Sequence, residues 1–573
     1  MRAPDERADR GGRRATRRAV LAGLGAVGLG TVGAATGRAR GAPASGSGVE
    51  RSASGGEPFA DPAALEAAVD RLMAERVGEE TPGAAVAVVE GDVLRLAKGY
   101  GVADVATGEP VRADGTAFRV GSVGKLVTWT AVVRGVQRGV LDLDADVNGY
   151  LDGSAVRVPN AHDAPVTLRH LGTHTAGFES TMDPALVADP GDVAPLETLL
   201  VERRPDRVRP PGAAVGYSNY GAALAGHVVA EAHDATFAEH ARSALFDPLG
   251  MTHATFAGPR PDARPGDLAA GHRREGESFA PASRTYVGLR PAGSLSATAT
   301  DMARFASAHL GDRPGAVGDA RVLDPGAARA MHRVHHVRHP AVNNWRYGFH
   351  GYGAPDANLL AHSGATLRST SLLVLAPDHD VGVFVSYNTG TDVARLEAVV
   401  DAVLDEYGLR PAPSRPAPTA APGGRERAAV VAGEYGATFL PEHGPLRLAD
   451  VLARLSVRAR GDGRLVTETP GGDAREWVET EPHVFREVGG RDVLAFETTD
   501  GAVDALNVSS VPQGVHEPVP LHERRAVTGG VVGASLGGFA LSLLGEGGVR
   551  AWRRWGGADA SSPTAAESGE GSR

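Results

Sequence analysis

The chain has 573 residues, of which 42% are hydrophobic, and its formal net charge is −10 at pH 7. This length and apolar content suffice for more than one domain with a large core, which excludes an intrinsically disordered chain. The acidic balance offers no basic field to a phosphate backbone, so we expect no nucleic-acid partner. The absence of cysteine excludes disulfides, thiol nucleophiles and cysteine-ligated zinc or iron–sulfur sites. Only two of the 59 basic residues are lysines, Lys98 and Lys125.

Residues 1–44 resemble an export signal, because a cationic stretch precedes an uncharged run and an A-x-A-like cleavage site at residues 42–44. Residues 16–21 (TRRAVL) are similar to the twin-arginine motif, which a receptor reads to export folded proteins. An ordinary secretory signal or an uncleaved anchor is the alternative. We therefore expect the chain to act outside the cytoplasm.

Residues 59–408 combine helical and strand periods without a break, and they predict one α/β domain with two lobes. Within this domain, the runs at 83–90 (GAAVAVVE) and 92–100 (DVLRLAKGY) predict a strand pair. Lys98 lies on the second run, and we interpret it as a solvated strand residue.

Ser122 stands just before a helix that the sequence predicts over residues 125–138, with Gly139 as its left-handed cap. Because positions i and i+3 share a helix face, the amine of Lys125 can reach the hydroxyl of Ser122. A desolvated lysine with a lowered pKa can take the hydroxyl proton near neutral pH, whereas arginine stays protonated. In a chain that uses arginine almost everywhere, a lysine at this position favours a Ser–Lys nucleophile pair.

The sequence around this pair resembles the serine β-lactamase and penicillin-recognising hydrolase family. The branch it resembles contains class C β-lactamases, D-alanyl-D-alanine carboxypeptidases, D-aminopeptidases and related esterases. The resemblance implies an α/β (α+β) domain in which helices and a helical lobe flank an antiparallel sheet. It covers residues 60–407 in the family's order, through the segments TAFRVGSVGKLVTWTAVVRGVQRGVLDLDADVNGYL, VTLRHLGTHTAGF, YSNYGAALAGHVV, LFDPLGMTHATF, PAGSLSATATDMARFA and AHSGAT.

The resemblance implies a role for each matched residue. Ser122 would be the acylated nucleophile and Lys125 its general base. Tyr217 and Asn219 match the family's Tyr-x-Asn element. The tyrosine would pass a proton to the leaving group, and the asparagine would bind Lys125 and the substrate amide.

The third motif departs from the β-lactamase pattern, because His362, Ser363 and Gly364 stand where those enzymes carry Lys-Thr-Gly. The backbone N–H groups of Ser122 and Ala365 would form the oxyanion hole. A histidine offers less fixed positive charge than a lysine near pH 7, which favours the peptidase and esterase members over a dedicated β-lactamase. Arg368 could supply the missing charge, although a surface role is the simpler interpretation.

Histidines elsewhere in the sequence give only weak support for a metal site. His335 and His339 have the i, i+4 spacing of some metal ligands, but no HExxH motif or nearby acidic ligand accompanies them. His170 and His174 lie in a matched segment that supports the site in the family. We therefore predict no metal and no organic cofactor.

The C-terminal part changes character after a Pro/Ala-rich linker at residues 409–427. Residues 428–511 show alternating apolar positions and glycine-containing turns, and they predict a small all-β domain, loosely similar to lipocalin-like modules. Residues 526–545 form an uncharged run with six glycines, from which we predict a C-terminal transmembrane helix that tethers the chain to a membrane. Residues 556–573 read as a polar, disordered tail.

Together these features predict an exported, membrane-tethered serine hydrolase that forms an acyl-enzyme with an amide or ester. Its substrate would be a D-amino-acid peptide, an ester or a β-lactam-like compound. The alternative is a receptor of the same fold that binds peptide or penicillin without turnover, or that deacylates slowly.

Overall fold

The computed structural model describes residues 60–525 and 527, except residues 182, 259–265, 311–320, 410–422 and 445. The predicted export signal at 1–44 and the predicted tail at 556–573 lie outside the described residues, as does most of the predicted linker. The chain divides into two compact units, residues 1–518 and 519–573. The first unit contains both domains described below.

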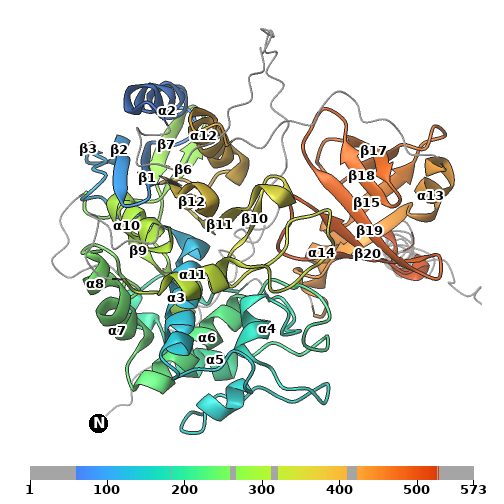
Figure 1. Ribbon diagram of the computed structural model, residues 1–573, viewed down its shortest axis with the longest axis horizontal. Helices are drawn as coiled ribbons and strands as arrows, with labels where there is room; N and C mark the ends of the chain where they lie inside the picture. Colours follow the sequence, from blue (N-terminus) through green and yellow to red (C-terminus); the bar gives the residue numbers. More distant parts are fainter. Residues whose placement is uncertain are drawn as a thin grey trace, which may run out of the picture. The chain divides into compact units, whose positions relative to one another are not determined.

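A seven-stranded antiparallel sheet forms the centre of the first domain (Figure 1), with the strand order β10-β11-β12-β13-β1-β2-β3. The predicted strand pair is confirmed, since β1 and β2 pair antiparallel beyond a turn at Gly91, which has φ +59°. The sheet comprises β1 (Gly83–Glu90), β2 (Val93–Asp104), β3 (Glu109–Pro110), β10 (His350–Tyr352), β11 (Leu359–Thr366), β12 (Ser369–Ala376) and β13 (Val381–Tyr387).

Both faces of this sheet are buried, and alternate residues of β1 therefore lie in two different hydrophobic cores. Val86 and Val88 face helices α2 (Pro62–Arg76) and α12 (Val393–Glu406), which lie side by side in Figure 1. Ala85 and Ala87 face α10 (Ala299–His309) and the larger core beyond it. The central strands are therefore nearly continuous apolar runs, as expected for a sheet covered on both sides.

A helical lobe packs beyond α10, around the buried helix α3 (Gly124–Gln137). The helix predicted after Ser122 is thereby confirmed, and Gly139 beyond its end has φ +71°. The lobe also holds α4 (Leu168–Gly172), α5 (Leu196–Glu202), α6 (Asn219–His233), α7 (Phe237–Ala241), α8 (Asp247–Leu249), α9 (Arg290–Gly293), α11 (Pro325–His332) and the turn η1 (Gly121–Val123). Short strands pair as β4 (Phe118–Arg119) with β9 (Ser296–Ala297), β5 (Leu186–Val187) with β8 (Tyr286–Val287), and β6 (His272–Glu275) with β7 (Ser278–Pro281).

The second domain is a closed eight-stranded antiparallel barrel. Buried side chains that include Trp477, Phe485 and Phe496 fill its core. The closing strand lies beyond residue 511, where the sequence analysis ended the domain. The sequence did not predict this strand, because three residues that end in a proline are too few to show an alternating pattern. The strands are β14 (Gly433–Ala437), β15 (Leu455–Ala459), β16 (Leu465–Glu468), β17 (Arg475–Glu481), β18 (Val484–Glu487), β19 (Val493–Thr499), β20 (Ala502–Val508) and β21 (His516–Pro518), with helices α13 (Gly424–Val430) and α14 (Arg447–Ala453).

The predicted C-terminal transmembrane helix must be corrected. Among the residues that the structure describes, none of the helices combines the length and the apolar character that crossing a bilayer requires. The predicted segment, 526–545, lies outside the described residues except for Val527. The prediction rested on an uncharged run of sufficient length, but six of its 20 residues are glycines, which contribute no apolar side chain.

Candidate active site

Two glycines allow the turn that carries Ser122 to meet strand β11. Gly121 has φ +55°, a conformation that side chains disfavour, and a Cβ on it would lie 2.8 Å from the backbone nitrogen of Ala365. A Cβ on Gly364 would lie 2.0 Å from the carbonyl oxygen of Val120 and 2.9 Å from the backbone nitrogen of Ser122. The structure thus brings together the backbone of Ser122 and Ala365, the two groups predicted to form an oxyanion hole.

Lys125 is fully buried at the start of α3, and its Nζ lies 2.9 Å from Ser122 Oγ. The amine also contacts two oxygens that can only accept hydrogen bonds, Asn219 Oδ1 at 2.8 Å and the carbonyl of Ala292 at 2.6 Å. Burial lowers the pKa of Lys125 to about 7. A neutral amine has two N–H groups, which these two acceptors use, so its lone pair is left for the hydroxyl proton of Ser122.

Tyr217 packs over the same amine, with its ring centre 4.8 Å from Lys125 Nζ. Burial raises the pKa of its phenol, and a hydrogen bond with Ser122 opposes that rise only in part. Tyr217 therefore keeps its proton near neutral pH and can donate it. Its backbone nitrogen donates to the carbonyl of Gln513, which belongs to the barrel domain.

Asn219 reaches Lys125 because it is the first residue of α6. The preceding residue, Ser218, has extended backbone angles and caps the helix by accepting from the backbone nitrogen of Gly221 at 3.0 Å. This cap fixes where the helix begins and so directs the Asn219 amide toward α3.

His362 lies beside Tyr217, with ring centres 6.2 Å apart. Its Nδ1 is 2.5 Å from the carbonyl oxygen of Ser363, so this nitrogen carries the proton and donates it. Burial holds the pKa of His362 well below its usual range, which keeps the ring neutral near pH 7. The Nε2 atom is buried without a hydrogen-bond partner among the described residues.

The site also contains residues to which the sequence analysis gave no direct role. The ring of His174 stacks against Tyr217 at 4.4 Å and meets Trp345 edge-on at 4.6 Å. Its Nδ1 accepts a hydrogen bond from the backbone nitrogen of Ser218, and burial lowers its pKa to about 3. These contacts pack His174 and Trp345 against Tyr217 and the start of α6. The sequence placed His174 in a supporting segment, but no sequence signal pointed to Trp345 or to the carbonyl of Ala292.

The other histidines predicted as weak metal candidates make structural contacts. His335 stacks on Tyr347 at 3.8 Å, and its Nε2 lies 2.7 Å from the carbonyl of Ala330. His339 Nδ1 accepts from the backbone nitrogen of Ala341. In the described part of the chain, no group of three or more His, Asp or Glu side chains could hold a metal ion.

Arg368 lies in the tight turn between β11 and β12. Its guanidinium donates to the carbonyl of Leu367, the residue before it. Its role in substrate binding remains a prediction.

The order of these elements and the Ser–Lys–Tyr–Asn arrangement match a known family. The family model described as Beta-lactamase matches residues 66–406, more than half of the chain. This chain belongs to the Beta-lactamase family. The relatives found include penicillin-binding proteins, an esterase and a D-aminopeptidase, so the family assignment makes the chain a serine-hydrolase relative.

Individual relatives agree with this assignment. Penicillin-binding protein 4 of Amycolatopsis lactamdurans is 30% identical over 362 residues, which are 62% of this chain and 93% of that protein. Esterase EstB of Burkholderia gladioli is 38% identical over 120 residues, 21% of this chain and 30% of that protein. The crystal structure of SurE with D-Leu is 25% identical, with a TM-score of 0.56, and covers 80% of this chain and 99% of that one.

Proposed function

We propose that this chain is an exported serine hydrolase that acts through an acyl-enzyme at Ser122 on an amide or ester substrate. The observation that carries the proposal is the buried amine of Lys125, whose hydrogen bonds to Asn219 and Ala292 leave a lone pair for the Ser122 hydroxyl. A serine without such a base is a poor nucleophile, and an arginine could not serve as the base.

Acylation follows from these contacts. As Ser122 Oγ attacks the substrate carbonyl, its proton passes to Lys125 Nζ, and the oxygen that gains charge is held by the backbone N–H groups of Ser122 and Ala365. The bond to the leaving group then breaks, and the leaving nitrogen or oxygen takes a proton from Tyr217. In the second half of the reaction, water gives a proton to the Tyr217 phenolate as it attacks the ester carbonyl. Lys125 then returns its proton to Ser122 Oγ as the ester bond breaks and the acid is released.

A D-amino-acid peptide or a related ester is the substrate class that we favour. The relatives include a penicillin-binding protein and an esterase, and a solved structure of the same fold is described with D-Leu. The neutral His362 in place of a lysine also supports a peptidase or esterase over a dedicated β-lactamase.

Replacing the nucleophile tests the proposal. Ser122→Ala should abolish covalent labelling by a fluorophosphonate and lower turnover by at least about a hundredfold, because removal of a nucleophile costs orders of magnitude. Intact-mass spectrometry after exposure to a fluorophosphonate, a penicillin and a D-Ala-D-Ala peptide would measure the adducts, with circular dichroism as the fold control. Wild-type turnover that survives this substitution would refute the assignment.

Deacylation needs a separate measurement. Rapid loss of the adduct after an initial burst supports a hydrolase. An adduct that persists would instead identify the chain as a slowly deacylating receptor. Export rests on the sequence of residues 1–44, and cell fractionation with N-terminal sequencing of the secreted chain would test it.

A further inference from the structure

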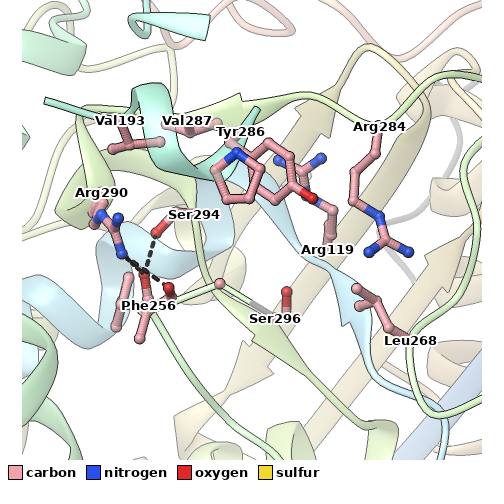
Figure 2. A pocket seen from close by; sticks show the side chains of 13 residues that line it. Arg119, Val193, Phe256, Leu268, Arg284, Tyr286, Val287, Arg290, Ser294 and Ser296 are labelled. Carbon is pink, nitrogen blue, oxygen red and sulfur yellow. Dashed lines mark hydrogen bonds between the residues drawn. The ribbon is translucent and has the colours of Figure 1, made fainter. Parts of the chain in front are cut away.

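A small pocket lies in the catalytic domain (Figure 2). It is lined by Arg119, Pro190, Val193, Phe256, Ala257, Gly258, Leu268, Arg284, Tyr286, Val287, Arg290, Ser294 and Ser296. Figure 2 shows Arg119 and Arg284 at one end, near Tyr286, and Arg290 with Ser294 at the other. Three of these lining residues are therefore arginines, and none is an aspartate or a glutamate.

The two arginines at the first end are like charges, and no described carboxylate forms an ion pair with either of them. Arg119 is half-buried and donates to the carbonyl of Thr285. Burial and the positive charge of Arg284 both lower the pKa of Arg119. Arg284 is exposed and forms no hydrogen bond or ion pair with any described residue. The positive charges of the two guanidinium groups repel each other, and an anion bound between them would offset this electrostatic repulsion.

The third arginine is held by backbone carbonyls. Arg290 donates to the carbonyl of Ala257 at 3.0 Å, and Ser294 Oγ donates to the carbonyl of Phe256 at the same distance. No described carboxylate pairs with Arg290 either. The positive charge of the whole pocket is thus uncompensated among the described residues.

The pocket adjoins the backbone of the turn that carries Ser122. Arg119 is on β4, three residues before Ser122, and pairs with Ser296 on β9. Gly293, which precedes the lining residue Ser294, packs so closely that a Cβ on it would lie 4.0 Å from the backbone nitrogen of Ser122. Tyr217, the predicted proton donor to the leaving group, does not line the pocket. Because the pocket adjoins the backbone of the nucleophile turn and not Tyr217, a substrate group bound there would belong to the part that stays on Ser122.

We propose that this pocket is a subsite for a carboxylate on the acyl part of the substrate, bound by Arg119 and Arg284. This inference rests on the proposed function, because it names a substrate class for the same acyl-enzyme. The preferred substrate then carries a negative charge on the part that becomes attached to Ser122. Arg284 is the residue to vary, since its side chain is exposed and its loss leaves no buried partner behind.

Matched esters test this subsite in the full-length protein. p-Nitrophenyl hydrogen glutarate carries a carboxylate at the end of its acyl chain, and p-nitrophenyl pentanoate is its neutral counterpart. Arg284→Gln should lower kcat/KM for the glutarate ester by about tenfold or more, the effect of losing one charge-assisted hydrogen bond, and change kcat/KM for the pentanoate ester less than about twofold. Added salt should reduce the difference.

Two controls accompany the measurement. Arg71→Gln removes one positive charge from an exposed position on α2, away from the pocket, and should change neither rate. The Ser122→Ala protein gives the background hydrolysis of each ester. An equal loss on both esters, or no loss on either, would overturn the subsite. A loss confined to 4-carboxyphenyl pentanoate, which has its charge on the leaving group, would overturn it as well.

Failure of the proposed function would look different, because the wild-type protein would hydrolyse neither ester above the Ser122→Ala background. In that case, a measurement of glutarate binding tests whether the pocket holds a carboxylate. Saturable thermal stabilisation by glutarate in the wild-type protein, absent in Arg284→Gln, would support the subsite. The same response in both proteins, or none in either, would reject it.

Discussion

The two lysines of the chain differ in burial and therefore in chemistry. Lys98 lies at the surface, where Glu66 and Asp70 of α2 bind its amine at 2.7 and 2.8 Å and raise its pKa. Lys125 is fully buried and pairs with no carboxylate of the described residues, and burial lowers its pKa to about 7. The difference in environment makes only Lys125 a candidate base.

Substitution by arginine separates charge from basicity. Lys125→Arg should lower kcat about as much as Lys125→Ala, by roughly a hundredfold or more, because a guanidinium stays protonated near neutral pH and cannot accept the proton of Ser122. Lys98→Arg is the matched control and should leave kcat unchanged, since an exposed ion pair tolerates either cation. Steady-state kinetics of the three variants would check this. Near-normal kcat in Lys125→Arg would mean that another group is the base.

The rate of acylation should depend on pH through the same amine. Lys125 acts as a base only when it is neutral, which is the major form above its pKa of about 7. We therefore expect kcat/KM to rise with pH up to about 7 and then to level off, with a slope near one below that point. His362 and Tyr217 should not titrate in this window, because burial lowers the pKa of the first and raises that of the second. A profile flat between pH 5 and 9 would contradict the role of Lys125.

At the scale of elements, the close approach of β11 to η1 determines the geometry around the nucleophile. Gly364→Ala would place a methyl group 2.0 Å from the carbonyl of Val120, which forces the strand away from the turn. We expect a loss of about 1–3 kcal/mol in the free energy of unfolding and a much slower labelling of Ser122.

A glycine without neighbours gives the control for this substitution. Gly326 lies in α11, and a Cβ on it would meet nothing within 4 Å. Gly326→Ala should therefore leave labelling unchanged and unfold at the same or a slightly higher temperature. Thermal unfolding and fluorophosphonate labelling rates would compare the two variants. Normal labelling in Gly364→Ala would show that the contact between β11 and η1 is not needed.

At the scale of the whole molecule, polar contacts join the barrel to the catalytic domain within one compact unit. Arg209 pairs with Glu517 and Glu442 of the barrel domain, and Trp345 Nε1 donates to the carbonyl of Pro512 at 2.6 Å. The backbone nitrogen of Tyr217 has its acceptor in the same stretch, at Gln513. The barrel thus completes the hydrogen bonds of residues that line the active site.

Truncation tests this dependence. A chain that ends after His522 keeps both domains and should retain the activity of the full chain. A chain that ends after Leu409 loses the acceptors of Tyr217 and Trp345, so we expect lower thermal stability and a large loss of kcat. Activity assays of both truncations, with circular dichroism, would measure the effect. Full activity in the shorter chain would show that the barrel has no part in the catalytic machinery.

The sequence by itself determined the local structure and indicated Ser122 and Lys125 as the candidate reacting pair. The strands β1 and β2, the helix after Ser122 and its cap at Gly139 depend on periodicity and on residues close in the chain, and all of them were predicted. The spacing of three residues between Ser122 and Lys125 is likewise local. The membrane-spanning helix was predicted wrongly, since an uncharged run was taken as sufficient.

Only the tertiary structure decided what surrounds this pair. Asn219 and Ala292, which bind Lys125, lie 94 and 167 residues further along the chain, and their contacts depend on how the helices pack. The lowered pKa of Lys125 arises from burial by these distant segments. The arginine pocket likewise joins residues from several short strands and turns. Solvent exclusion and charge proximity are sums over the packed molecule, so no local pattern in the sequence encodes them.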